Sequence, residues 1–96
     1  RPCALPILNE TGNPGMATAG GGDVLAGICA AYLAASRLAA SSDFDVLRAA
    51  RAAVHVHGLA GDLAVEALGE RGVTAGELIV HLPLAQRAHL AALASE

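Results

Sequence analysis

The chain has 96 residues and a mass of 9.5 kDa, enough for one domain at most, and its 54% hydrophobic content excludes an intrinsically disordered polypeptide. Nine acidic residues outnumber six basic ones, all of which are arginine, and the net charge is −3. This balance excludes a basic surface for nucleic acid, and the lack of lysine excludes a P-loop in this chain. Alanine occupies 23 positions, so each buried side chain removes little apolar surface from water.

The cysteine content and the longest apolar stretch indicate a cellular setting. Cys3 and Cys29 are too few for a disulfide framework, which favours a reducing compartment. Residues 24–36 carry no charge, but a membrane-spanning helix needs about 20 such residues. The sequence therefore predicts a cytoplasmic protein without a membrane segment.

The first part of the chain predicts a strand, a loop and a helix. Residues 4–8 are apolar and include Pro6, which favours a short strand at a sheet edge or a strand start. Residues 11–22 contain five glycines and a proline, a composition that excludes regular structure. Asp23 then opens a segment that is apolar on nearly every side, which is typical of a helix buried between two layers.

The remaining elements are all predicted to be helical. Residues 41–43 form a polar break, and Asp43 is a candidate N-cap for a second long helix that ends at Gly69 and Gly72. Its apolar positions are Val46, Leu47, Ala50, Val54, Leu59, Leu63 and Val65, and its two glycines, Gly58 and Gly61, allow a neighbour to approach closely.

The C-terminal segment is predicted as two pieces. Thr74 and Glu77 have capping-box spacing and start a short helix. Pro83 then starts a final amphipathic helix that ends near Leu93. A single strand cannot form a sheet, so the order of elements predicts the C-terminal part of an α/β domain.

The glycine run before Asp23 is the clearest candidate for chemistry. Glycines that lead into a helix N-terminus present backbone N–H groups and the positive end of the helix dipole to an anion. Gly20, Gly21 and Gly22 lack a Cβ, so a phosphate could reach the backbone. Asp23 could then accept the proton of a substrate hydroxyl during phosphoryl transfer. The same aspartate could equally be a helix cap, and spacing alone does not separate the two interpretations.

Other polar residues have weaker functional interpretations. His55 and His57 are spaced like a metal pair, but residues two apart on a helix point in different directions, so we expect no metal site there. We expect His57 to pack near Gly58, and Asp62 to have a structural role within the helical layer. Cys29 is expected to be a small apolar core residue.

Three stretches together resemble one known family. The first is the run of residues 9–27, Asn-Glu-Thr-Gly-Asn-Pro-Gly-Met-Ala-Thr-Ala-Gly-Gly-Gly-Asp-Val-Leu-Ala-Gly; the second is residues 57–64; the third extends from Gly72 through Leu78 to Pro83. They closely resemble the ADP/ATP-dependent NAD(P)H-hydrate dehydratases of the ribokinase-like superfamily. The resemblance covers nearly the whole chain, and the first stretch is long enough to be specific.

The resemblance implies a fold and a reaction. It implies that residues 1–96 are the C-terminal portion of a ribokinase-like three-layer α/β/α domain, mostly helical with one N-terminal strand. The activity is that of a lyase: hydrated NADH or NADPH is phosphorylated on its ring hydroxyl by ADP or ATP, usually with Mg²⁺, and loss of phosphate restores the double bond.

The resemblance also implies site residues. Asp23 is the expected catalytic base and contacts the hydrated cofactor, and Gly22 contacts the nucleotide. The full expected set is Thr18, Gly20, Gly21 and Gly22 for the nucleotide, and Asn13, Gly15 and Asp23 for the substrate.

Two departures from the family pattern leave alternatives open. The family usually has threonine where this chain has Gly21, and the larger N-terminal part of the family domain is absent. We therefore expect association with that missing portion, or a homo-oligomer. One alternative function is a ribokinase-like kinase of a small alcohol such as a vitamin precursor, although residues 13–18 favour the dehydratase. The other is a non-catalytic fragment that binds anions or partners.

Overall fold

The computed structural model describes residues 9–39 and 46–95, and this part of the chain is entirely helical apart from its connecting segments. The elements in chain order are η1 (Pro14–Met16), α1 (Gly21–Ala39), α2 (Val46–Leu68), η2 (Glu70–Gly72) and α3 (Ala75–Ala94). No strand occurs among the described residues. The predicted strand at 4–8 and the predicted N-cap Asp43 lie outside them.

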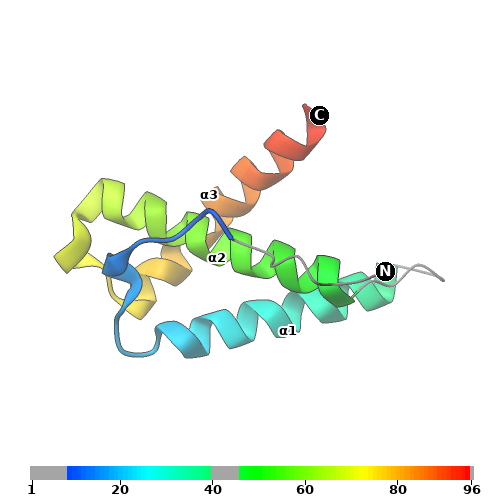
Figure 1. Ribbon diagram of the computed structural model, residues 1–96, viewed down its shortest axis with the longest axis horizontal. Helices are drawn as coiled ribbons and strands as arrows, with labels where there is room; N and C mark the ends of the chain where they lie inside the picture. Colours follow the sequence, from blue (N-terminus) through cyan, green and yellow to red (C-terminus); the bar gives the residue numbers. More distant parts are fainter. Residues whose placement is uncertain (1–8, 40–45, 96) are drawn as a thin grey trace.

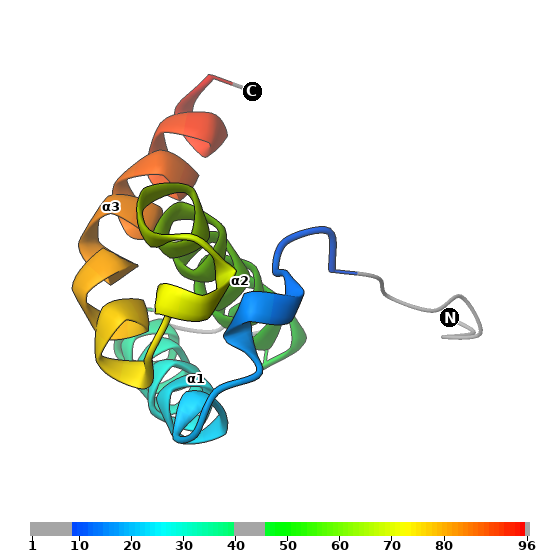
Figure 2. The ribbon, with the colours of Figure 1, turned by 90° about the vertical axis from the view of Figure 1, so that its left-hand side faces the viewer.

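The helix α2 is the centre of the fold. It packs against both α1 and α3, whereas α1 and α3 touch each other much less (Figures 1 and 2). The molecule measures 42 × 28 × 28 Å, and α3 diverges from α1 toward its C-terminal end (Figure 1). The segment that precedes α1 lies against α2, beside the start of α1 (Figure 2).

The core of this bundle consists largely of alanine. One face of α2 is buried, and it consists of Ala49, Ala53, Val56, Ala60 and Ala64. The larger apolar residues predicted for this helix differ in burial. Val46 and Leu47 are half exposed, whereas Leu59 and Leu63 pack at the edge of a core cluster. Small side chains on this face let the neighbouring helices approach closely, so α2 can occupy the centre of a tightly packed bundle.

The helix α1 is less buried than its composition predicts. Only Gly21 and Ile28 are buried among its described residues, and Leu38 is 88% exposed. The expectation of a helix covered on all sides is wrong for the described chain because α2 and α3 cover one side of α1 only. Among the described residues, no helix is long and apolar enough to cross a membrane.

The ends of the helices test the predicted boundaries. Gly69, with φ +78°, follows α2 as predicted, and its N–H donates to the carbonyl of Val65 at 2.7 Å. The N-cap of α3 is also confirmed, because the Thr74 hydroxyl accepts a hydrogen bond from the Glu77 N–H at 3.2 Å.

The predicted restart at Pro83 is wrong. Pro83 lies inside one continuous helix, α3, and does not begin a second one. A proline costs a helix one hydrogen bond, here to the carbonyl of Ile79. Both residues are exposed, so water can satisfy that carbonyl, while burial of Leu78 and Ala85 stabilises the helix on either side.

Candidate functional site: a glycine loop anchored on α2

Residues 11–20, here called the glycine loop, run along the surface of α2 before α1 begins. The Thr11 hydroxyl donates to the backbone carbonyl of His55 at 2.9 Å. Gly12 then adopts φ +108°, a conformation that glycine reaches without steric cost. The loop is therefore packed on a helix and is not a free surface segment.

Two glycines of α2 make this close packing possible. A Cβ at Gly58 would collide with Thr11, including its backbone, and a Cβ at Gly61 would collide with the side chain of Met16. Both glycines are buried. The predicted close approach is confirmed, and the neighbour that approaches is the glycine loop.

Asp62, next to Gly61, fixes the loop through both carboxylate oxygens. One oxygen accepts the Gly12 N–H at 3.1 Å, and the other accepts the side-chain amide of Asn13 at 2.7 Å. The expectation of a structural role is therefore correct, but its partner is the glycine loop and not the helical layer. Gly58, Gly61 and Asp62 are together called the loop anchor below.

Hydrogen bonds within the chain continue from the anchored residues to α1. The Met16 N–H donates to Asn13, the Thr18 N–H to Met16, and the Gly21 N–H to Thr18, at 3.1, 2.8 and 3.1 Å. Gly20, with φ +85°, turns the chain into the helix. These bonds connect the anchored part of the loop to the α1 N-terminus, residues 20–23.

The α1 N-terminus begins earlier than predicted and leaves backbone donors open. Gly21 and Gly22 already belong to α1, two residues before the predicted start at Asp23. The first internal bond of the helix runs from the Val24 N–H to Gly20. Within the described residues the amides of Gly22 and Asp23 have no backbone acceptor, as the geometry of a helix start requires. Both residues are exposed.

The three consecutive glycines have different surroundings. Gly20 requires its positive φ, whereas a Cβ at the buried Gly21 would lie 3.1 Å from the carbonyl oxygen of Met16. A Cβ at Gly22 would meet nothing within 4 Å. Backbone conformation therefore accounts for glycine at position 20, and the close contact with Met16 disfavours a side chain at Gly21, but packing does not account for Gly22.

The two other residues expected to bind substrate lie in the anchored part of the loop. A Cβ at Gly15 would lie 2.9 Å from a methyl group of Val65 and 3.1 Å from the Cα of Glu70. The Asn13 amide nitrogen is bound by Asp62, and its oxygen is buried without a hydrogen-bond partner. Both residues shape the loop where it meets α2 and η2.

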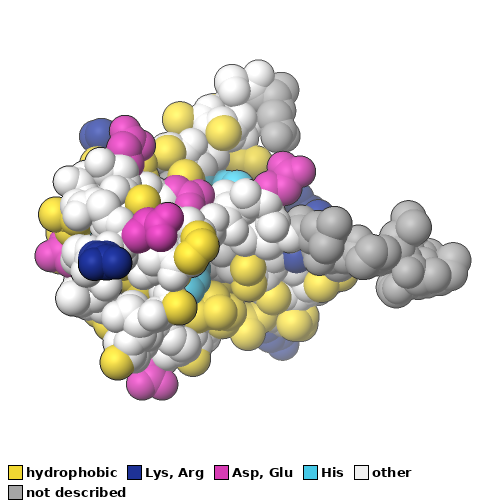
Figure 3. Space-filling model, turned by 60° about the vertical axis from the view of Figure 1, so that its left-hand side comes forward, with side chains coloured by type: hydrophobic (Ala, Val, Ile, Leu, Met, Phe, Trp, Pro, Cys, Tyr) yellow, Lys and Arg dark blue, Asp and Glu magenta, His cyan; other side chains and the backbone are white. Residues whose placement is uncertain are grey.

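The charged side chains near the glycine loop do not favour the binding of an anion. Acidic side chains are more widespread than basic ones on the face shown in Figure 3. An anion at the α1 N-terminus would therefore depend on backbone N–H groups and the helix dipole. The carboxylate of Asp23 lies on the same turn.

His57 lies next to the α1 N-terminus, whereas the sequence predicted only that it packs near Gly58. Burial lowers the pKa of its imidazole below the ordinary value, and a hydrogen bond with the backbone of Gly21 opposes that shift. Its Nε2 atom is buried without a partner. His57 therefore packs against the α1 N-terminus in its neutral form at pH 7.

The two histidines of α2 have different neighbours. The ring of His55 lies beside that of His89 of α3, with ring centroids 5.1 Å apart, whereas His57 packs against Gly21. Among the described residues, no group of three or more histidine, cysteine, aspartate and glutamate side chains could bind a metal ion.

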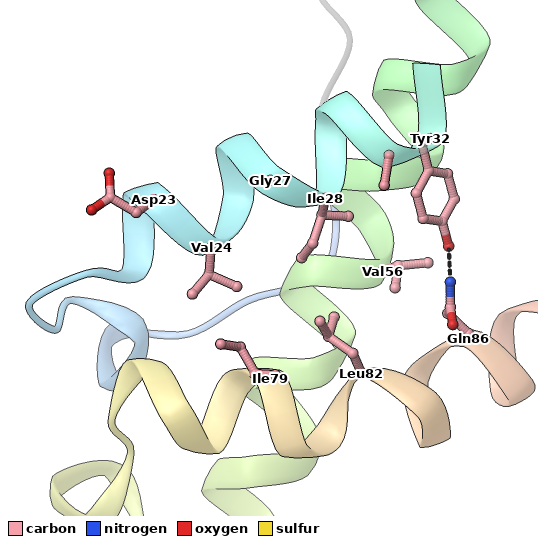
Figure 4. Close-up of a pocket in the computed structure, with 10 residues that line it drawn as sticks. Asp23, Val24, Gly27, Ile28, Tyr32, Val56, Ile79, Leu82 and Gln86 are labelled. Atoms are coloured by element: carbon pink, nitrogen blue, oxygen red, sulfur yellow. Dashed lines mark hydrogen bonds between the residues drawn. The ribbon is translucent and has the colours of Figure 1, made fainter. Parts of the chain in front are cut away.

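A groove lies between α1 and α3 on another side of α1. It has a volume of about 520 Å³, and its walls are apolar side chains such as Val24, Ile28 and Leu82 (Figure 4). A hydrogen bond of 3.2 Å from Gln86 to the Tyr32 hydroxyl closes one end. Asp23 also lines this groove, at the end where α1 begins, and its carboxylate is directed away from the apolar side chains of the walls (Figure 4).

Comparison with known proteins supports the family resemblance found in the sequence. A family model described as NAD(P)H-hydrate dehydratase matches residues 4–84. A bifunctional NAD(P)H-hydrate repair enzyme of Thermofilum pendens is 47% identical over 87 residues, which cover 91% of this chain and 15% of that protein. The corresponding enzyme of Moorella thermoacetica is 46% identical over 80 residues, 83% of this chain and 14% of its own length.

A third relative has a narrower description. The ADP-dependent (S)-NAD(P)H-hydrate dehydratase of Neisseria meningitidis is 43% identical over 72 residues, covering 74% of this chain and 22% of that protein. The chain thus spans about one seventh to one fifth of these relatives. No solved structure matches the chain.

Proposed function

Because the chain belongs to the NAD(P)H-hydrate dehydratase family, we propose that it forms the phosphate-binding and base-bearing part of a site that dehydrates hydrated NADH or NADPH. The observation that supports this function is the α1 N-terminus itself. Two open backbone amides, at Gly22 and Asp23, and an exposed carboxylate occupy one helical turn. A series of hydrogen bonds connects that turn to the loop anchor.

The proposed roles follow from these surroundings. The backbone of residues 20–22 and Thr18 would bind the terminal phosphates of ADP or ATP, and the open space at Gly22 leaves room for them. Asp23 would contact the hydrated nicotinamide ring. Asn13 and Gly15 would complete the substrate side of the site while they shape the loop.

The proposed reaction proceeds in two steps. Asp23 accepts the proton of the ring hydroxyl as the hydroxyl oxygen attacks the terminal phosphorus, and the bond from that phosphorus to the nucleotide breaks. The carbon–oxygen bond to the new phosphate group then breaks, a neighbouring carbon loses a proton, and the ring double bond returns. Positioning and electrostatics supply most of the acceleration in phosphoryl transfer.

Magnesium is expected from the family but has no ligand cluster in the described part of the chain. Asp62 is already bound to the loop, which leaves Asp23 as the carboxylate at the α1 N-terminus. Protein carboxylates are commonly supplemented by substrate phosphates around Mg²⁺, so the nucleotide would bring most of its ligands.

We also propose that this chain functions in contact with further protein, either the larger part of the family domain or another copy. The described helices expose large apolar side chains, with Leu38 at 88%, Val80 at 65% and Leu90 at 63%. Sedimentation analysis would detect self-association directly.

The test of the proposed function is a substrate comparison. The protein is incubated with Mg²⁺ and either ADP or ATP, first with hydrated NADH and then with thiazole and pyrimidine alcohols. We expect NADH absorbance to return with the hydrated cofactor. Phosphorylation of the alcohols alone would instead identify a small-alcohol kinase, and nucleotide binding without either reaction would identify a non-catalytic fragment.

A further inference from the structure

Both carboxylate oxygens of Asp62 bind the glycine loop, whereas the carboxylate of an ordinary surface residue on a helix is bound by water. It lies on α2, six residues before the helix ends at Leu68, so it does not cap that helix. Its two oxygens accept hydrogen bonds from two consecutive residues 50 and 49 positions away in sequence, at 3.1 and 2.7 Å. No ion pair with Asp62 is present in the described residues.

The two bonded residues lie outside the helices, immediately before η1. Gly12 has φ +108° and, as a glycine, could adopt many other conformations. Asn13 is extended and precedes the short helix η1. A carboxylate that accepts from both residues selects one conformation at each of them, and charge-assisted bonds are stronger than neutral ones.

The effect of this selection extends to the α1 N-terminus. The backbone bonds from Met16 to Asn13, from Thr18 to Met16 and from Gly21 to Thr18 link the residues bound by Asp62 to the first residue of α1. A change at Asp62 would therefore displace the donors at Gly22 and Asp23 without touching a ligand.

We propose that Asp62 is a positioning residue: it acts through Gly12 and Asn13 to place the backbone donors and the carboxylate at the α1 N-terminus. The proposal rests on the proposed function for its catalytic meaning. The loop-fixing role itself is independent of that function and can be tested separately.

The test compares Asp62→Asn with a matched control. The asparagine keeps the size of the side chain but presents an N–H group to one of the two loop donors, so one hydrogen bond is lost. Glu66→Gln removes the same charge from an exposed residue one turn further along α2. Hydrogen exchange is measured for the loop, residues 12–21, and for the buried α2 segment, residues 53–60, and ADP is titrated into each variant.

We expect loop amides in Asp62→Asn to exchange about tenfold faster or more, as loss of a hydrogen bond to a charged group implies. Exchange in the α2 segment should stay at the parent rate, and ADP affinity should fall about tenfold. Glu66→Gln should match the parent in all measurements.

A double variant provides the rescue. When Asp62→Asn is combined with Asn13→Asp, the amide introduced on α2 can accept from the Gly12 N–H and donate to the carboxylate introduced in the loop, so both bonds are restored. We expect slow loop exchange to return. Rescue would not occur if the effect of Asp62→Asn came from the loss of negative charge on α2 itself, because the double variant carries its carboxylate in the loop.

Two results would overturn the proposal. One is unchanged loop exchange in Asp62→Asn, and the other is equal acceleration of loop and α2 exchange, which would make Asp62 a general stabilising residue. If the parent protein does not bind ADP, the proposed function fails, while the exchange comparison still decides whether Asp62 fixes the loop.

Discussion

The loop anchor on α2 and the α1 N-terminus both depend on glycine, but for different physical reasons. At Gly58 and Gly61 a Cβ would occupy space that the glycine loop already fills. At Gly22 a Cβ would project into open space within the described chain. Packing within the folded chain requires the first two glycines, whereas only a bound ligand would require glycine at position 22.

This difference separates stability from binding in a single loop. The anchored half makes its contacts with protein, through Thr11, Met16 and Asp62. The open half presents N–H groups without backbone acceptors in the described residues. Substitutions in the two halves should therefore change different measured quantities.

The largest expected effect is on turnover, at the α1 N-terminus. Asp23→Asn should lower the rate of phosphoryl transfer by about 10²–10⁴-fold, the range typical of the loss of a general base. Nucleotide affinity should stay close to that of the parent because the backbone amides are unchanged. Single-turnover kinetics measure the chemical step directly, and a rate within a few-fold of the parent would remove Asp23 from the mechanism.

At the loop anchor the expected effect is on stability. Gly58→Ala would place a Cβ 2.8 Å from the backbone carbonyl carbon of Thr11, and overpacking of this kind costs about 1–3 kcal/mol. Part of that cost is offset by the higher helix propensity of alanine, about 1 kcal/mol. Thermal or denaturant unfolding measures the balance, with Gly27→Ala as the control because a Cβ at Gly27 meets nothing within 4 Å.

A Gly58→Ala variant that is more stable than the parent by about 1 kcal/mol, the full gain from helix propensity, would contradict the account of the loop anchor. The same outcome would imply that the loop can leave α2 without cost. Gly27→Ala should be at least as stable as the parent, since it lies on an exposed position of α1.

Much of this arrangement could be predicted from the sequence, and the failures have physical causes. The end of α2 at Gly69 and the Thr74 cap follow from local chemistry, and the structure confirms both. The predicted break at Pro83 is wrong because burial on both sides of the proline outweighs one lost hydrogen bond. Helix propensities read from the local sequence do not include this contribution from tertiary packing.

The partner of Asp62 could not be predicted in the same way. Its two donors lie 50 and 49 residues away, beyond any local pattern. A signal was nevertheless present: Gly58, Gly61 and Asp62 fall on one face of a helix at spacings of three and four residues. Two glycines beside a carboxylate on one face indicate a close backbone neighbour with free N–H groups.

The smallest expected effect is on the pH dependence of stability, and it involves His57, which packs against the first residue of α1. Because burial lowers the pKa of His57 below 6.5, the unfolded chain binds a proton on this residue more readily than the folded chain does. Stability from this residue is therefore fully present above about pH 6.5 and decreases as the pH falls, until the folded pKa is passed. Melting curves across this range should show a weaker pH dependence in His57→Gln.

An unchanged pH dependence in His57→Gln would assign the effect to other groups.

The central claim is that Gly22 is kept free of a side chain for a nucleotide phosphate and not for the fold, and ADP titration into Gly22→Ala tests it directly. The account predicts at least about tenfold weaker binding, or 1.4 kcal/mol, in a protein whose melting temperature is equal to or above that of the parent. Unchanged ADP affinity together with a lower melting temperature would contradict it.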